Sequence, residues 1–102
     1  MTNTQTAAGQ ARVTVVTAAA CHFCEDALTA LTGLGRAYPL TVEEVAADSP
    51  AGQALLGQHG TGMFPLVLID GGFFSAGRLP RRKLARLLAA RGAAAAAGAG
   101  AR

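Results

Sequence analysis

Hydrophobic and polar residues follow two patterns along the 102-residue chain. Short runs of branched aliphatic residues, typical of strands, are separated by longer stretches in which apolar residues recur every three or four positions, as on one face of a helix. The short runs predict strands at residues 12–17, 40–46, 66–69 and 73–76. The longer stretches predict helices at about residues 24–36, 50–59 and 80–91.

Turn and capping residues support these divisions. Ser49 and Pro50 suit the N-cap and the first position of a helix, and Gly60 suits a left-handed C-cap. Asp70 and Gly71 suit the tight turn of a hairpin between the last two strands.

The resulting order, β-α-β-α-β-β-α, predicts an α/β domain with a thioredoxin-like fold. We expect a four-stranded mixed sheet with helices on both faces, in which two strand–helix crossovers join parallel neighbours and a hairpin adds two antiparallel strands. Residues 40–46 are predicted at an edge of the sheet, because Glu43 and Glu44 interrupt the apolar pattern. The domain is predicted at residues 12–91, with a disordered leader at 1–11 and an Ala/Gly-rich tail at 92–102 that either frays or stays helical.

Composition restricts the class of protein. Alanine supplies 24 residues of the hydrophobic 51%, so the core must rest on larger side chains. No window approaches the ~20 consecutive apolar residues of a membrane helix, and the first twelve residues lack the basic start and apolar run of a secretory signal. We therefore expect a cytoplasmic monomer of one domain that does not bind a membrane.

The two cysteines, Cys21 and Cys24, form a C-x-x-C motif where the first strand leads into the first helix. In a reducing compartment, such a close pair indicates redox or metal chemistry more often than a structural disulfide. Zinc needs about four ligands, and the chain offers only His22 and His59 besides the thiols. His22 lies between the cysteines and could hardly reach the same ion, so no metal site is expected.

The chain resembles the glutaredoxin family over about residues 12–88. The resemblance rests on Cys21-His22-Phe23-Cys24 and on Met63-Phe64-Pro65 before the third strand. It implies that Cys21 is the nucleophile and Cys24 the resolving thiol of a redox-active disulfide. It also implies that the Phe64–Pro65 bond is cis beside the cysteines, so that the Phe64 backbone can pair with substrate.

Helix chemistry agrees with this assignment, because free N–H groups at a helix N-terminus stabilise a thiolate. Alternatives stay open for three neighbours of the cysteines. His22 is either a cation that favours the thiolate or a solvent-facing residue, and Phe23 either contacts a substrate or packs in the core. Pro65 by itself also fits an ordinary proline that opens a strand.

A basic stretch departs from the family where glutathione specificity arises. Typical members have a Gly-Gly and an acidic pair after the last hairpin, whereas this chain has Arg78, Arg81 and Arg82. The positive charge of Arg81 and Arg82 at a helix N-terminus opposes the macrodipole, which is weak support for a site, including Arg78, that binds a small anion or an acidic partner protein. The alternative is a solvated helix face. Nucleic acid is disfavoured because aromatic residues do not alternate with the basic ones.

The resemblance, together with the chemistry of the C-x-x-C motif, implies a glutaredoxin-like thiol–disulfide oxidoreductase, an enzyme that reduces protein or small-molecule disulfides through Cys21 and Cys24. Its substrate contacts are expected at His22, Phe23, Phe64, Pro65 and Arg78. No tightly bound cofactor is expected, and glutathione or an equivalent small thiol is the expected reductant. The alternatives are a carrier of an iron–sulfur cluster between two chains and an interaction module with little turnover.

Overall fold

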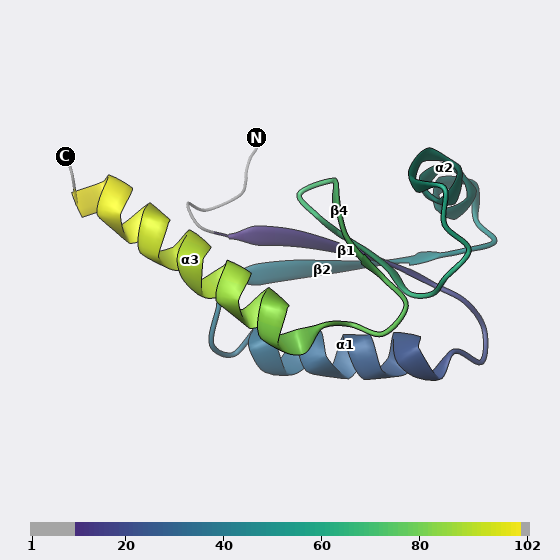
Figure 1. Cartoon of the computed structure of the whole chain (residues 1–102), viewed down its shortest axis with the longest axis horizontal. Helices are drawn as coiled ribbons and strands as arrows, with labels where there is room; N and C mark the ends of the chain where they lie inside the picture. The colour runs from purple at the N-terminus through teal and green to yellow at the C-terminus, as the bar shows by residue number, and fades with distance from the viewer. Residues whose placement is uncertain (1–9, 101–102) are drawn as a thin grey trace.

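A computed structural model describes residues 10–100, with the side chains described as far as Gly92. Within residues 10–100 it is a small α/β fold, drawn in Figure 1. The strands are β1 (Ala11–Thr17), β2 (Leu40–Ala46), β3 (Leu66–Ile69) and β4 (Gly72–Ala76). The helices are α1 (His22–Leu34), α2 (Pro50–His59) and α3 (Arg81–Gly100).

The strands form one mixed sheet in the order β2-β1-β3-β4. β1 and β2 are parallel, with Ala11 opposite Leu40, and β2 lies at an edge as predicted. β3 is antiparallel both to β1 and to β4. The expectation of parallel neighbours across the second crossover is therefore wrong, because the chain that leaves α2 re-enters the sheet on the far side of β1 in the opposite direction.

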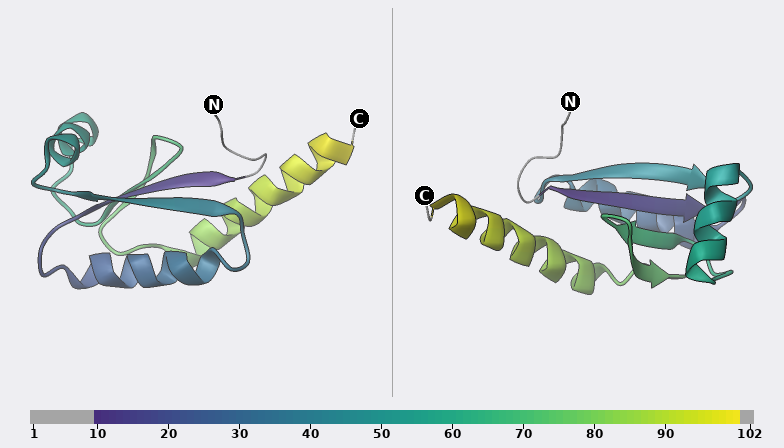
Figure 2. Two further views of the ribbon diagram at one scale, coloured as in Figure 1. Left: turned by 180° about the vertical axis from the view of Figure 1, so that it is seen from behind. Right: turned by 90° about the horizontal axis from the view of Figure 1, so that it is seen from above.

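Helices cover both faces of the sheet (Figures 1 and 2). Leu31 of α1 and Leu84 and Leu88 of α3 are buried in one core with alternate residues of β1 and β3. On the other face, Leu55 and Leu56 of α2 pack against the buried side chains of Val16, Leu66 and Leu68. Both faces of β1 and β3 are therefore covered, which explains why β3 is apolar throughout and why Val15 and Val16, which point to opposite faces of β1, are both buried.

Several element ends differ from the sequence prediction. β1 begins at Ala11, which is fully buried and whose N–H donates to the Pro39 oxygen at 3.1 Å. α1 begins at His22. The backbone of α3 continues past the predicted end at residue 91 and remains helical to Gly100, which is the helical alternative for the tail. Alanine has the highest helix propensity, and this outweighs the glycines there. The predicted leader up to residue 9 and the last two residues lie outside the described part of the chain.

Local turn chemistry is as the sequence predicts. Ser49 caps α2 by accepting from the N–H of Gly52, and Pro50 follows it in the first helical turn. Gly60 ends α2 with φ 64°, in the left-handed region. Asp70 and Gly71 take φ values of 51° and 84° in the turn between β3 and β4. Among the described residues, no helix is long and apolar enough to cross a membrane.

Candidate functional site

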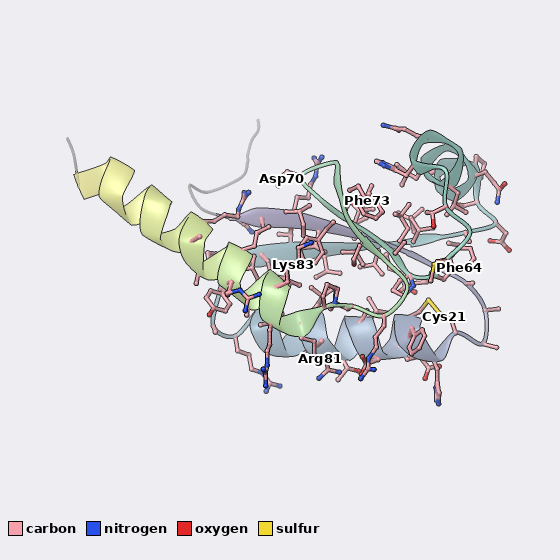
Figure 3. The ribbon with its side chains drawn as sticks, viewed as in Figure 1. Cys21, Phe64, Asp70, Phe73, Arg81 and Lys83 are labelled. Carbon is pink, nitrogen blue, oxygen red and sulfur yellow. A yellow bond between two sulfur atoms is a disulfide. The ribbon has the colours of Figure 1, made fainter. Side chains whose placement is uncertain are left out.

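Three loops meet at one end of the sheet because of its strand register. Val16 of β1 lies opposite Leu66 of β3, and Leu66 lies opposite Ala76 of β4. The chain after β1, the chain before β3 and the chain after β4 therefore emerge together. The N–H of Gly77 donates to the Pro65 oxygen at 3.0 Å and ties two of these loops. Figure 3 shows the labelled Cys21 and Phe64 at this end of the molecule.

The two cysteines occupy the first of these loops and the start of α1. Cys21 is the N-cap of α1, and its sulfur accepts from the Cys24 N–H at 3.1 Å. The Cys21 carbonyl oxygen accepts from the Glu25 N–H at 3.2 Å, which closes the first helical turn. The two residues form a disulfide, with Cα atoms 5.2 Å apart. A reversible bond between neighbouring thiols is compatible with redox activity.

The two sulfurs are unequally accessible. Cys24 faces the core and is 3% exposed, whereas Cys21 is half-buried before the helix begins. An external thiol or disulfide can therefore approach Cys21 more easily than Cys24. The Cys24 N–H, at the N-terminus of α1, points at the same sulfur. In the reduced protein this N–H would stabilise negative charge on that sulfur.

The Phe64–Pro65 peptide bond is cis, as the resemblance implied. Pro65 is buried, and the half-buried side chain of Phe64 packs on the α2 side with Val16, Leu66 and Leu68. The Phe64 ring therefore contributes to packing beneath α2, and the Phe64 backbone lies at the end of the sheet where the three loops meet.

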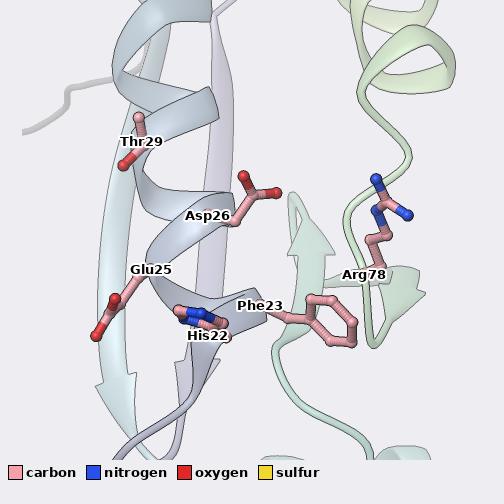
Figure 4. A pocket seen from close by; sticks show the side chains of 6 residues that line it. All are labelled: His22, Phe23, Glu25, Asp26, Thr29 and Arg78. Carbon is pink, nitrogen blue, oxygen red and sulfur yellow. The ribbon is translucent and has the colours of Figure 1, made fainter.

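A pocket of about 400 Å³ opens beside the cysteines (Figure 4). It is lined by residues of α1 together with one arginine of the loop after β4: His22, Phe23, Glu25, Asp26, Thr29 and Arg78. Phe23 is 50% exposed, which excludes the core alternative for its ring. His22 is exposed at the start of the helix. The predicted contacts His22, Phe23 and Arg78 are thus brought together.

Sequence reasoning missed the part of this pocket formed by Asp26 and Thr29. Its signal is the spacing of His22, Asp26 and Thr29, which are four and then three residues apart and so share one face of a helix. Arg78, 52 positions beyond Asp26, joins that face only through the fold, and its place in the pocket agrees with its selection from the sequence.

A second pocket, of about 610 Å³, adjoins the first and is strongly basic. Asp26 and Arg78 line both pockets. Arg81 forms an ion pair with Asp26 that links α3 to α1. The Lys83 ammonium lies 5.1 Å from the centre of the Phe74 ring.

Comparison with family models and with curated proteins finds no match for this chain. The part of the chain that the structure describes contains no group of three or more histidine, cysteine or acidic residues placed to hold a metal ion.

Proposed function

We propose that this chain is a glutaredoxin-like thiol–disulfide oxidoreductase with a thioredoxin-like fold. The observation that carries the proposal is the disulfide between an accessible cysteine at a helix N-cap and a buried cysteine one turn later. That arrangement provides one sulfur to attack and one to resolve. The mixed sheet with helices on both faces and the cis Pro65 support the fold assignment.

Each catalytic step is an exchange at sulfur. In the reduced protein the Cys21 thiolate attacks a substrate disulfide, forms a mixed disulfide and releases one substrate thiolate. The Cys24 thiolate then attacks the Cys21 sulfur, which forms the internal disulfide and releases the second substrate thiolate. Both released thiolates take protons from solvent. Two molecules of an external thiol, such as glutathione, restore the dithiol and are themselves oxidised to a disulfide.

The surrounding residues have distinct tasks in this proposal. The Cys24 N–H holds charge on the attacking sulfur, as its bond to Cys21 in the oxidised protein supports. The Phe64 backbone offers an edge for an extended substrate, and the exposed Phe23 ring provides apolar contact. His22 and Arg78, at the mouth of the same pocket, are the polar contacts for the substrate.

A turnover assay tests the proposal. Reduction of bis(2-hydroxyethyl) disulfide, a small neutral substrate, is followed with glutathione, with other small thiols and with a thioredoxin reductase as electron donor. Cys21→Ser is expected to abolish turnover with every donor, because no other thiol is accessible. Cys24→Ser is expected to accumulate a mixed disulfide on Cys21, visible as added mass that dithiothreitol removes. Equal turnover by wild type and Cys21→Ser would exclude the proposed role of Cys21.

A further inference from the structure

The pocket at the start of α3 concentrates positive charge. Its lining consists of one carboxylate, five cationic residues and two apolar residues: Asp26, Arg78, Arg81, Arg82, Lys83, Arg86, Leu79 and Pro80. This lining carries a formal charge of +4 (five cations less one carboxylate), against +3 for the whole chain. The charge imbalance of the protein is therefore a local feature of this pocket.

Most of this charge is not neutralised within the described part of the chain. Arg81 is paired with Asp26, and Lys83 lies over the Phe74 ring. Arg78, Arg82 and Arg86 are exposed, and no carboxylate among residues 10–92 pairs with them. The first turn of α3 contains no acidic residue. Its cations therefore face the positive end of the helix dipole, an arrangement that an external anion would relieve.

The basic pocket leads directly to the redox cysteines. Asp26 and Arg78 form its border with the pocket that contains His22 and Phe23, the two residues after Cys21. Figure 4 shows Arg78, in the loop after β4, across from the first turns of α1, with the Phe23 ring between them. Met63 is 61% exposed, and its methyl group lies next to Gly77, one residue before Arg78. A chain seated on α3 can thus reach Cys21 past exposed apolar side chains.

We propose that this pocket docks an acidic segment of a protein substrate and so directs a neighbouring disulfide of that protein to Cys21. This inference rests on the proposed function and names its substrate class. Arg82 and Arg86 are four residues apart, about 6 Å along the helix. Alternate residues of an extended chain are separated by roughly 6.6 Å, so carboxylates at alternate positions match the two guanidinium groups.

The same surface is a poor fit to nucleic acid. Glu25 and Asp26 line the adjoining pocket and would repel a phosphate backbone that continued toward the cysteines. No aromatic side chain lines the basic pocket, so it offers no ring on which a base can stack. A carboxylate-rich polypeptide that is apolar near its disulfide matches both halves of the surface.

Binding is tested first, without any redox step. A rhodamine-labelled peptide with glutamate at alternate positions and no cysteine is titrated with the oxidised protein, and its anisotropy is recorded. The Arg82→Gln/Arg86→Gln double variant should bind about tenfold more weakly, because two partly exposed ion pairs are lost. The Arg12→Gln/Arg36→Gln variant is the matched control. It removes the same net charge from exposed arginines at the opposite end of the sheet and should bind like the wild type.

Competition identifies the ligand class. Binding should weaken between about 0.05 M and about 0.3 M salt, because exposed charges are screened. A peptide with glutamine in place of glutamate should fail to compete. Equal loss in both double variants, competition by free glutamate at the concentration of the peptide, or stronger competition by a single-stranded oligonucleotide would each overturn the proposal.

Turnover then tests whether docking selects substrates. Two disulfide-bridged peptides are compared, one flanked by alternating glutamates and one by glutamines at the same positions. The wild type should favour the acidic peptide by about tenfold in kcat/KM, and the Arg82→Gln/Arg86→Gln variant should lose this ratio. Reduction of both peptides at equal rates overturns the docking inference and leaves the oxidoreductase proposal intact. Binding of the acidic peptide without reduction of any disulfide would overturn the oxidoreductase proposal and leave the acidic-segment site as a binding site only.

Discussion

Cys21 occupies a position that oxygen-bearing side chains usually hold. Helix N-caps favour serine, threonine, aspartate and asparagine, whose oxygens accept strongly from the first free N–H groups. Here a sulfur accepts from the Cys24 N–H instead. A neutral sulfur is a weak acceptor, but a thiolate is charged and gains more from the same contact. The cap therefore favours the reactive form of Cys21 once the disulfide is reduced.

This asymmetry predicts unequal alkylation. In the reduced protein near neutral pH, iodoacetamide should modify Cys21 well before Cys24, because Cys21 is half-buried and capped whereas Cys24 is 3% exposed. Mass spectrometry of peptides from timed reactions checks the order. Faster labelling of Cys24 would reverse the assigned roles.

At the scale of elements, the contact between α2 and β2 depends on a glycine. A Cβ atom built on Gly52 would lie 2.0 Å from the Ala46 carbonyl oxygen, and the Gly52 N–H also donates to the hydroxyl oxygen of the N-cap Ser49. The atoms that such a Cβ would meet belong to the backbone of Ala46 and Ala47, which cannot move aside as the end of a flexible side chain can. The absence of a side chain at this position therefore allows α2 to lie against the end of β2.

We expect Gly52→Ala to destabilise the protein by about 1–3 kcal/mol, the usual range for overpacking. Gly57→Ala in the same helix is the matched control, since nothing lies within 4 Å of a Cβ built there. That substitution should be neutral or stabilising by up to about 1 kcal/mol, from helix propensity alone. Urea unfolding monitored by circular dichroism measures both. Similar losses of stability in the two variants would show that the cost of alanine at position 52 does not come from the contact with Ala46.

The first turn of α3 permits a second comparison. Arg82→Glu places a carboxylate at the positive end of the helix dipole and removes the repulsion from Arg86, so it should stabilise by about 0.3–1 kcal/mol. Arg81→Glu gains the same dipole term but breaks the ion pair with Asp26 and brings two carboxylates together. It should be less stable than Arg82→Glu by up to about 1 kcal/mol, since the pair is exposed. Equal unfolding midpoints for the two variants would show that the Arg81–Asp26 pair adds no stability.

The elements that sequence predicted well are those set by neighbouring residues. Ser49, Pro50 and Gly60 define α2, and Asp70 with Gly71 defines the hairpin, because each acts within one turn of chain. The antiparallel pairing of β3 with β1 was missed, since the pattern of a strand covered on both faces does not contain its direction. The end of α3 was placed at Gly92 and the state of the following tail was left open, because alanine favours a helix and glycine opposes it.

The candidate site shows the same division between local and distant information. The cysteine motif and the cis Pro65 follow from short sequence patterns. The Arg81–Asp26 pair joins residues 55 positions apart, so nothing near either residue indicates it. That pair also changes the interpretation of the basic stretch, because the dipole mismatch assigned to Arg81 and Arg82 is offset by a carboxylate of the protein at Arg81 and not at Arg82.

At the scale of the whole molecule, one carboxylate joins segments from three parts of the chain. Asp70 accepts from the Arg12 N–H at 2.9 Å and donates its own N–H to the Arg12 oxygen at 2.8 Å. Its other carboxylate oxygen lies 2.6 Å from the Arg91 guanidinium. This ion pair is partly exposed, since the Arg91 side chain is 33% exposed and that of Asp70 is 42% exposed. The start of β1, the hairpin turn and α3 therefore meet at the end of the sheet opposite the cysteines.

Two substitutions separate the parts of this junction. Asp70→Asn keeps an oxygen for the Arg12 N–H and tolerates φ 51°, so it loses only the ion pair and should cost about 0–1 kcal/mol. Asp70→Ala also loses the hydrogen bond. In addition, alanine has no polar side chain that could hydrogen-bond nearby and so compensate for the left-handed backbone conformation, which adds about 1–2 kcal/mol. Urea unfolding at low and high salt separates the ion pair from the other contributions. Screening by salt should reduce the stability lost in Asp70→Asn, and the difference in unfolding free energy between the two variants should stay unchanged. Glu43→Gln, at an exposed carboxylate unpaired in the described structure, controls for the charge. Equal stabilities of Asp70→Asn and Asp70→Ala would mean that the ion pair alone, and neither the turn nor the backbone contact, holds this end of the molecule.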